Sequence, residues 1–197
     1  MLFSLIMPLH LGGQDLYFSQ FFNNLLYLNP GYTGSAHQPR VSFTYRNQMP
    51  ALGSPYVSYY ASYDQPVKAL QGGLGINVLN DVQGPALNSI RADLMYAYFL
   101  AVNPKITIQA GFQASYCHRF LKRSELVLPD ELENQTLTQE AIGDMSKGYP
   151  DFAVGFVGFT RNAYAGVSMH HLARPNLSLS KQERQPLPRR LVVHGGM

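Results

Sequence analysis

The chain has 197 residues, enough for one domain with a sizeable core. Charged residues make up 14% of it, against about 25% in an average soluble domain, while 13 Tyr and 11 Phe accompany no Trp. The mean hydropathy is −0.12 and no later stretch forms an apolar run of about 18 residues, which excludes a helical membrane protein. The net charge is +3, but the basic residues are scattered, so the composition disfavours nucleic-acid binding.

The first 13 residues, MLFSLIMPLHLGG, are typical of the apolar part of a signal peptide and predict export. A basic n-region is missing and Leu11 is a poor residue for a cleavage site, so the alternative is a buried N-terminal strand or helix. Residues 14–39 begin amphipathic and end in an Asn-Pro-Gly cluster. They predict a short helix or coil followed by a turn.

From Arg40 onward, apolar and polar residues alternate with the period of a β-strand. The predicted strands cover residues 41–46, 56–63, 70–78, 89–98, 105–116, 151–160 and 162–172, with an eighth beginning near Arg190. In the fifth, Ile108 and Phe112 fall on one face and Gln109 and Gln113 on the other. The pattern fits either a soluble sandwich or a membrane barrel that is apolar outside and polar inside.

The connections favour the barrel. Those after the second, fourth and sixth strands are short, and include residues 66–68 and 103–105. Those after the other strands are longer, above all residues 121–150 and 174–188. Outer-membrane barrels keep short turns on the periplasmic side and long loops outside, whereas a soluble sandwich has no reason to do so. Residues 40–197 are therefore predicted to form an all-β, antiparallel transmembrane barrel of about eight strands, incomplete because the last strand has just begun.

Two candidate catalytic arrangements are weak. Cys117 is the only cysteine, and its neighbour His118 points to the opposite strand face, so a thiol–base pair is not expected. Ser168 and His170 share a face, but no orienting acid or oxyanion donor is specified. We interpret His170 and His171 instead as amphipathic rings near the membrane interface on the loop side.

Other motifs also have simpler explanations. The carboxylates of Asp130, Glu131 and Glu133 crowd one loop, where they are expected to be solvated rather than bound to a metal. The glycines of residues 72–77 lack a following helix, so they predict a bent or tightly packed wall and not a nucleotide loop. Asn134 begins an Asn-Gln-Thr sequon without meaning in a bacterial envelope. No catalytic, cofactor-binding or metal-binding residue is predicted.

Several blocks together resemble a known family. QDLYFSQFFNNLLYLNPGYTGS, YRNQMPAL, YYASYDQP, GGLGINVLNDVQGP, MYAYFL, PDFAVGF and YAGVSMHHLARP occur in this order. They resemble the PorP/SprF family of type IX secretion system outer-membrane proteins of Bacteroidetes. The resemblance implies a barrel in the bacterial outer membrane, without catalysis or cofactor, that assists the secretion or surface display of partner proteins such as adhesins, and gliding. It also implies that this chain is the N-terminal part of a longer barrel.

The expected partners are outer-membrane lipid, the type IX machinery and a secreted adhesin-like client, with no nucleic acid. The resemblance also implies that the N-terminal segment, residues 14–39, lies in the periplasm or inside the barrel lumen, and that Asn29 and Pro30 set its turn. Arg46 is expected to point into the lumen and to form a salt bridge there with a residue such as Asp93. A passive porin or solute channel and a lipid-modifying barrel enzyme are the alternatives, and the second would need a Ser–His–acid set.

Overall fold

The computed structural model of the protein describes residues 23–48, 56–122, 145–178 and 185–197. The predicted signal peptide, the loop carboxylates Asp130, Glu131 and Glu133, and Asn134 lie outside these residues. Within the described part, no helix is both long enough and apolar enough to cross a bilayer.

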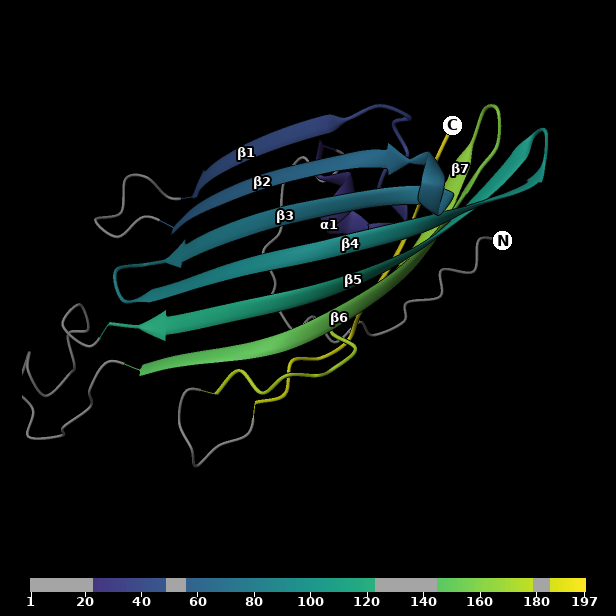
Figure 1. The fold of residues 1–197 in the computed structure, drawn as a ribbon. Coiled ribbons are helices and arrows are strands. Elements are labelled where there is room, and N and C mark those ends of the chain that lie inside the picture. Colours follow the sequence, from purple (N-terminus) through teal and green to yellow (C-terminus); the bar gives the residue numbers. More distant parts are fainter. Residues whose placement is uncertain (1–22, 49–55, 123–144, 179–184) are drawn as a thin grey trace, which may run out of the picture.

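Eight antiparallel strands form one sheet in simple sequence order, from β1 to β8. The strands are β1 (Arg40–Gln48), β2 (Tyr56–Val67), β3 (Gly72–Gln83), β4 (Leu87–Asn103), β5 (Ile106–Leu121), β6 (Met145–Phe159), β7 (Tyr164–His170) and β8 (Arg190–Gly196). The sheet curls into an open half-barrel (Figure 1). The predicted all-β fold of eight antiparallel strands is confirmed.

The two faces of the sheet differ as the alternating pattern predicts. The convex face carries large apolar side chains that stay exposed, among them Val41, Phe43, Tyr45, Tyr59, Ile76, Leu94, Ile108, Phe112, Tyr116, Phe156, Leu191 and Val193. On the concave face, Gln109 is 2% exposed and Gln113 is 3% exposed. The predicted separation of Ile108 and Phe112 from Gln109 and Gln113 is therefore confirmed.

The connections follow the predicted alternation with two corrections. Residues 68–71, 104–105 and 160–163 join strands at one end, and the remaining connections lie at the other. There, β3 runs on to Gln83, so residues 84–86 form a tight turn in which Gly84 has a φ of 70°. The prediction that every connection at this end is long is wrong at this turn. The long loop after β5 is also shorter than predicted, because β6 begins at Met145.

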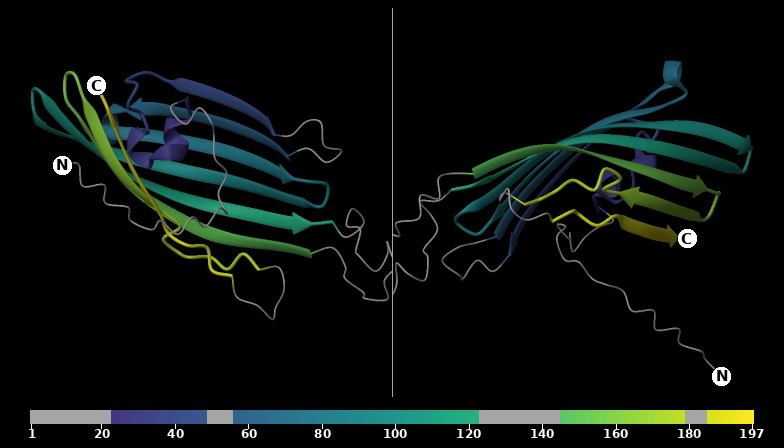
Figure 2. Two further views of the ribbon diagram at one scale, coloured as in Figure 1. Left: turned by 180° about the vertical axis from the view of Figure 1, so that it is seen from behind. Right: turned by 90° about the horizontal axis from the view of Figure 1, so that it is seen from below.

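A short helical segment lies inside the curve of the sheet. It contains α1 (Leu25–Leu28) and the 3-10 turn η2 (Pro30–Tyr32), and Figure 2 shows the strands wrapped around it. We call residues 23–34 the inner segment. Leu26 and Tyr32 pack with Met95 and Val157 of the wall, and Tyr27 packs with Tyr60 and Leu79. The core of the described protein is thus the contact between the inner segment and the concave face.

Candidate functional site

A row of small residues crosses the concave face beneath the inner segment. Strand register places Gly73, Ala97, Gly111, Gly155 and Ser168 side by side on β3, β4, β5, β6 and β7. We call these five the small-residue row. Because these five side chains are small, they leave space above the sheet along the row. The backbone of the inner segment can therefore approach the sheet closely.

The contacts show how close this approach is. A Cβ atom added to Gly111 would overlap the backbone of Pro30 and Gly31. One added to Gly73 would overlap the carbonyl oxygen of Thr33, and one added to Gly155 would overlap the side chain of Asn29. The tightly packed wall predicted from the glycines of residues 72–77 is confirmed at Gly73, and the packing partner is the inner segment.

Asn29 anchors the inner segment to β6 and β7. Its side chain is fully buried, and its Oδ1 accepts a hydrogen bond of 2.8 Å from the backbone N–H of Gly31. Its Nδ2 donates to the carbonyl oxygens of Phe156 and Val167, each at 3.2 Å. The expectation that Asn29 and Pro30 set the turn is confirmed, since Pro30 opens η2 and Asn29 caps it.

These bonds also fix the state of His194 on β8. Asn29 Nδ2 has two N–H groups for three neighbouring acceptors, so one N–H is shared between two of them. His194 Nε2, at 3.0 Å, faces this donor and accepts, and the proton of the neutral ring lies on Nδ1. His194 Nδ1 then donates to the hydroxyl of Tyr32 at 3.1 Å. Burial raises the pKa of the Tyr32 phenol above its ordinary value, so Tyr32 is neutral. The inner segment is held on this side by neutral hydrogen bonds.

A buried ion pair holds the other end of the inner segment. Asp64 of β2 is 1% exposed and accepts 2.9 Å and 3.0 Å hydrogen bonds from Arg40 Nε and Nη2. Its Oδ2 also accepts from the backbone N–H of Gly34 at 2.7 Å. Gly34 has a φ of 74°, a conformation that favours glycine. The carboxylate therefore joins the start of β1 to the end of the inner segment.

The Ser168–His170 pair serves the same attachment. Ser168 Oγ donates to the carbonyl oxygen of Leu28 at 2.8 Å, and His170 Nε2 donates to the same oxygen at 3.1 Å. Ser168 Oγ and His170 Nε2 also lie 3.2 Å apart. Because both groups point their protons at the Leu28 carbonyl oxygen, Nε2 has no lone pair to take a proton from the serine in this arrangement. Ser168 and His170 are 1% and 3% exposed, so the interpretation of His170 as an interface residue is wrong.

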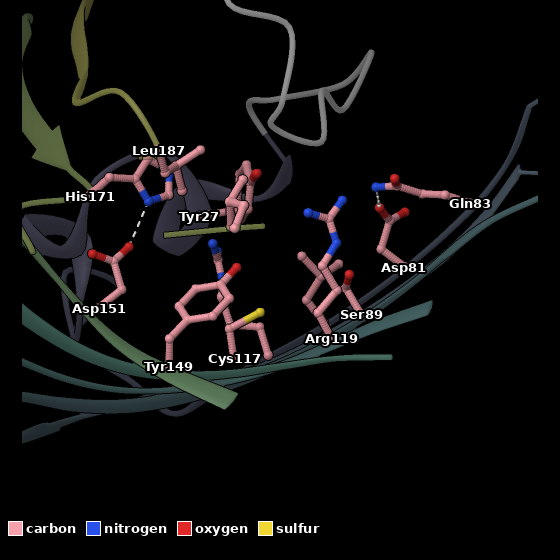
Figure 3. A pocket seen from close by; sticks show the side chains of 13 residues that line it. Tyr27, Asp81, Gln83, Ser89, Cys117, Arg119, Tyr149, Asp151, His171 and Leu187 are labelled. Carbon is pink, nitrogen blue, oxygen red and sulfur yellow. Dashed lines mark hydrogen bonds and ion pairs between the residues drawn. The ribbon is translucent and has the colours of Figure 1, made fainter. Parts of the chain in front are cut away.

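A small cavity lies between the inner segment and the loop-side half of the concave face (Figure 3). Its volume is about 80 Å³. Its lining includes Tyr27, Leu79, Asp81, Gln83, Ser89, Arg91, Cys117, Arg119, Tyr149, Asp151, His171, Leu177 and Leu187. His171 is 4% exposed and its Nδ1 bonds Asp151 Oδ2 at 2.6 Å, so His171 too lies away from the predicted interface.

Of the remaining sequence predictions, one agrees with the structure and one does not. Cys117 is buried at the cavity and His118 lies on the opposite face, as expected. Arg46 bonds its strand neighbour Gln48 at 2.8 Å, whereas Asp93 pairs with Arg91 at 3.3 Å. The predicted Arg46–Asp93 salt bridge is therefore wrong. Among the described residues, no group of His, Cys, Asp or Glu is arranged to hold a metal ion.

Three features of the site were not predicted from the sequence. The ion pair of Arg40 with Asp64 joins β1 to β2, and the bond of His171 with Asp151 joins the residue after β7 to β6. A single sequence does not align these residues. The small-residue row left a visible signal, since Gly73, Gly111 and Gly155 all fall at concave-face positions of their strands. Their common row became evident only from the register.

Comparison with known proteins identifies a family but no individual relative. No curated protein and no solved structure matches the chain. Residues 11–197 match the family described as type IX secretion system membrane protein PorP/SprF, a match that spans nearly all of the sequence. That description names a membrane component of a secretion system and no catalytic activity. The chain belongs to the PorP/SprF family of type IX secretion system membrane proteins.

Proposed function

We propose that the protein is an outer-membrane component of type IX secretion that assists the secretion or surface display of partner proteins, such as adhesins used in gliding. It acts without catalysis, by binding other machinery proteins and a secreted client. The family supports the secretion role in general terms. The outer membrane, the client and the adaptor role are our proposal.

The faces of the sheet support a location in the outer membrane. The convex face exposes apolar side chains on every strand, and such an area is stable only against lipid or another apolar surface. The concave face carries the buried polar residues, including Asp64, Asp93 and Gln113. Outer-membrane barrels likewise have apolar side chains on the outer face of the wall and polar side chains on the inner face.

The observation that carries the adaptor role is the filled concave face. The inner segment lies on the small-residue row, and hydrogen bonds or ion pairs tie it to β2, β6, β7 and β8. A passive porin keeps its lumen open for solutes. The occupied interior of the described half-barrel therefore favours a protein-binding component over a porin.

Gene deletion with surface proteomics tests the proposal. Loss of the gene should remove one or a few proteins from the cell surface while other type IX cargo is still secreted. Re-expression of the full protein should restore the missing proteins, which controls for effects on neighbouring genes. An unchanged surface combined with lost uptake of a small solute would contradict the proposal and favour the porin.

A further inference from the structure

The cavity of Figure 3 has one feature that the attachment of the inner segment does not explain. Arg119 of β5 lines it, and the Nε of Arg119 is buried without a hydrogen-bond partner among the described residues. An arginine in a partly buried site is stable when an anion pairs with it, because desolvation otherwise penalises the charge.

The neighbouring residues do not supply that anion. Asp81 accepts bonds of 2.6 Å from Ser58 Oγ and from Gln83 Nε2. Asp151 is bonded to His171. The other oxygen of Asp151, Oδ1, is buried without a partner, yet neither carboxylate forms an ion pair with Arg119 within the described residues.

A second cation lies beside Arg119. Lys147 of β6 is the direct cross-strand partner of Arg119, on the same face. Its ammonium donates to the carbonyl oxygen of Ser178 at 2.7 Å, a neutral partner. Like charges opposite each other on neighbouring strands repel, and an anion between or beside them relieves the repulsion.

The size of the cavity restricts the ligand. A volume of about 80 Å³ exceeds the roughly 10–15 Å³ that one water molecule needs, but it is far below the roughly 300–1,000 Å³ of ordinary small-molecule sites. The roof includes Leu187 from the β7–β8 connection and Tyr27 from α1, which suit the apolar stem of a side chain. The site therefore fits one protruding group, not a cofactor.

We propose that this cavity binds a carboxylate of a partner protein, a side-chain or C-terminal carboxylate, with Arg119 as its main ligand. The carboxylate enters from the end of the half-barrel that carries the long connections. This proposal rests on the proposed function, because the carboxylate belongs to a protein that the component assists.

Cys117 provides a reporter, since it is the only cysteine and lines the same cavity. The purified full protein is alkylated in separate reactions with iodoacetate, which carries a carboxylate, and with neutral iodoacetamide. The ratio of the two rates cancels any change in the reactivity of the thiol itself. In Arg119→Gln this ratio should fall roughly tenfold, the loss expected for one charge-assisted hydrogen bond.

Arg46→Gln is the matched control, because Arg46 is a concave-face arginine that does not line the cavity. Its rate ratio should equal that of the native protein. Acetate should slow alkylation of the native protein and not of Arg119→Gln. An equal rate ratio in the native protein and Arg119→Gln would overturn the proposal. Protection by phosphate but not by acetate would overturn the assignment of a carboxylate.

A second measurement does not depend on reaction at Cys117. Acetate should raise the unfolding midpoint of the native protein and leave that of Arg119→Gln unchanged, whereas equal shifts would overturn the site. In cells, normal surface display with Arg119→Gln, together with loss in the gene deletion, would reject the site and leave the proposed function standing. An unaltered surface in the deletion would reject the proposed function itself.

Discussion

The guanidinium of Arg40 binds both carboxylate oxygens of Asp64, and the backbone N–H of Gly34 shares one of those oxygens. The first strand and the inner segment are thus fastened to β2 at one buried point. Asp64→Asn keeps the shape but removes the charge, leaving Arg40 without its partner. We expect a loss of about 3 kcal/mol in the free energy of unfolding, measured by urea titration in lipid vesicles.

The control for this prediction is Asp81→Asn. Asp81 is also a concave-face aspartate, but its two partners are the neutral side chains of Ser58 and Gln83. The cost there should be smaller, because no arginine loses its counter-charge. Equal losses in both variants would mean that the Arg40–Asp64 pair contributes nothing particular.

Gly111→Ala tests the close approach of the inner segment. The added methyl group overlaps the backbone of Pro30 and Gly31, which cannot rotate away as a side chain could. We expect destabilisation by about 1–3 kcal/mol and faster proteolysis within the inner segment. Gly158→Ala is the matched control, since its Cβ would meet only the Ala165 carbonyl oxygen, at 3.8 Å. If both variants were equally resistant to protease, the inner segment would not lie on this row.

Asn29→Asp should strongly destabilise the folded protein, although the two side chains are nearly equal in size. A carboxylate oxygen in place of Nδ2 would face the carbonyl oxygens of Phe156 and Val167 and the lone pair of His194 Nε2. Three favourable contacts become repulsive in a fully buried position, so we expect a loss of roughly 3 kcal/mol or more. The unfolding midpoint should recover at low pH, where the carboxyl group is protonated. A midpoint equal to that of the native protein at neutral pH would contradict the orientation of the amide.

Ile108→Arg tests the proposed lipid contact of the convex face. Ile108 is 38% exposed there, and Arg near the bilayer midplane costs about 2–4 kcal/mol. Folding into vesicles should therefore be impaired, as measured by heat-modifiable gel migration, while Ile108→Val should fold normally. Gln109→Arg is not a suitable control for this variant, because Gln109 lies buried beneath the inner segment and its replacement would disturb that packing. Normal insertion of Ile108→Arg would place this face in water.

The proposed topology puts the short turns in the periplasm. In a Cys117→Ser background, a membrane-impermeant thiol reagent on intact cells should label Glu131→Cys, in the long β5–β6 connection, and spare Lys105→Cys, in the β4–β5 turn. Both variants should be labelled after the cells are opened, which controls for the presence of the protein. The reverse pattern on intact cells would invert the topology.

The fold was accessible from the sequence because period-two alternation and turn residues are local signals. Ile108 against Gln109 shows this, since neighbours in sequence must point to opposite faces of a strand. Strand ends were less accessible. β3 continues through Asp81 to Gln83, where it pairs with β2 and Asp81 accepts a bond from Ser58, and these are tertiary contacts that a local pattern does not contain.

The site was accessible only in part. The Asn-Pro-Gly turn was evident from its residues, but its position on the concave face depends on contacts that span more than a hundred residues, as between Asn29 and Val167. His170 and His171 were misinterpreted because amphipathic rings suit an interface equally well. Their buried partners, the Leu28 carbonyl oxygen and Asp151, come from distant parts of the chain.

The small-residue row also bears on assembly of the sheet. If β5 slipped by one residue against its neighbours, Phe112 or Ala110 would turn inward and the apolar face would be lost, an error that lipid rejects. A slip of two residues keeps the faces correct, yet it brings Gln109 or Gln113 to the place of Gly111, beneath Pro30. The larger side chain would then prevent the inner segment from packing on the concave face. The inner segment can therefore pack only against strands that are paired in the native register.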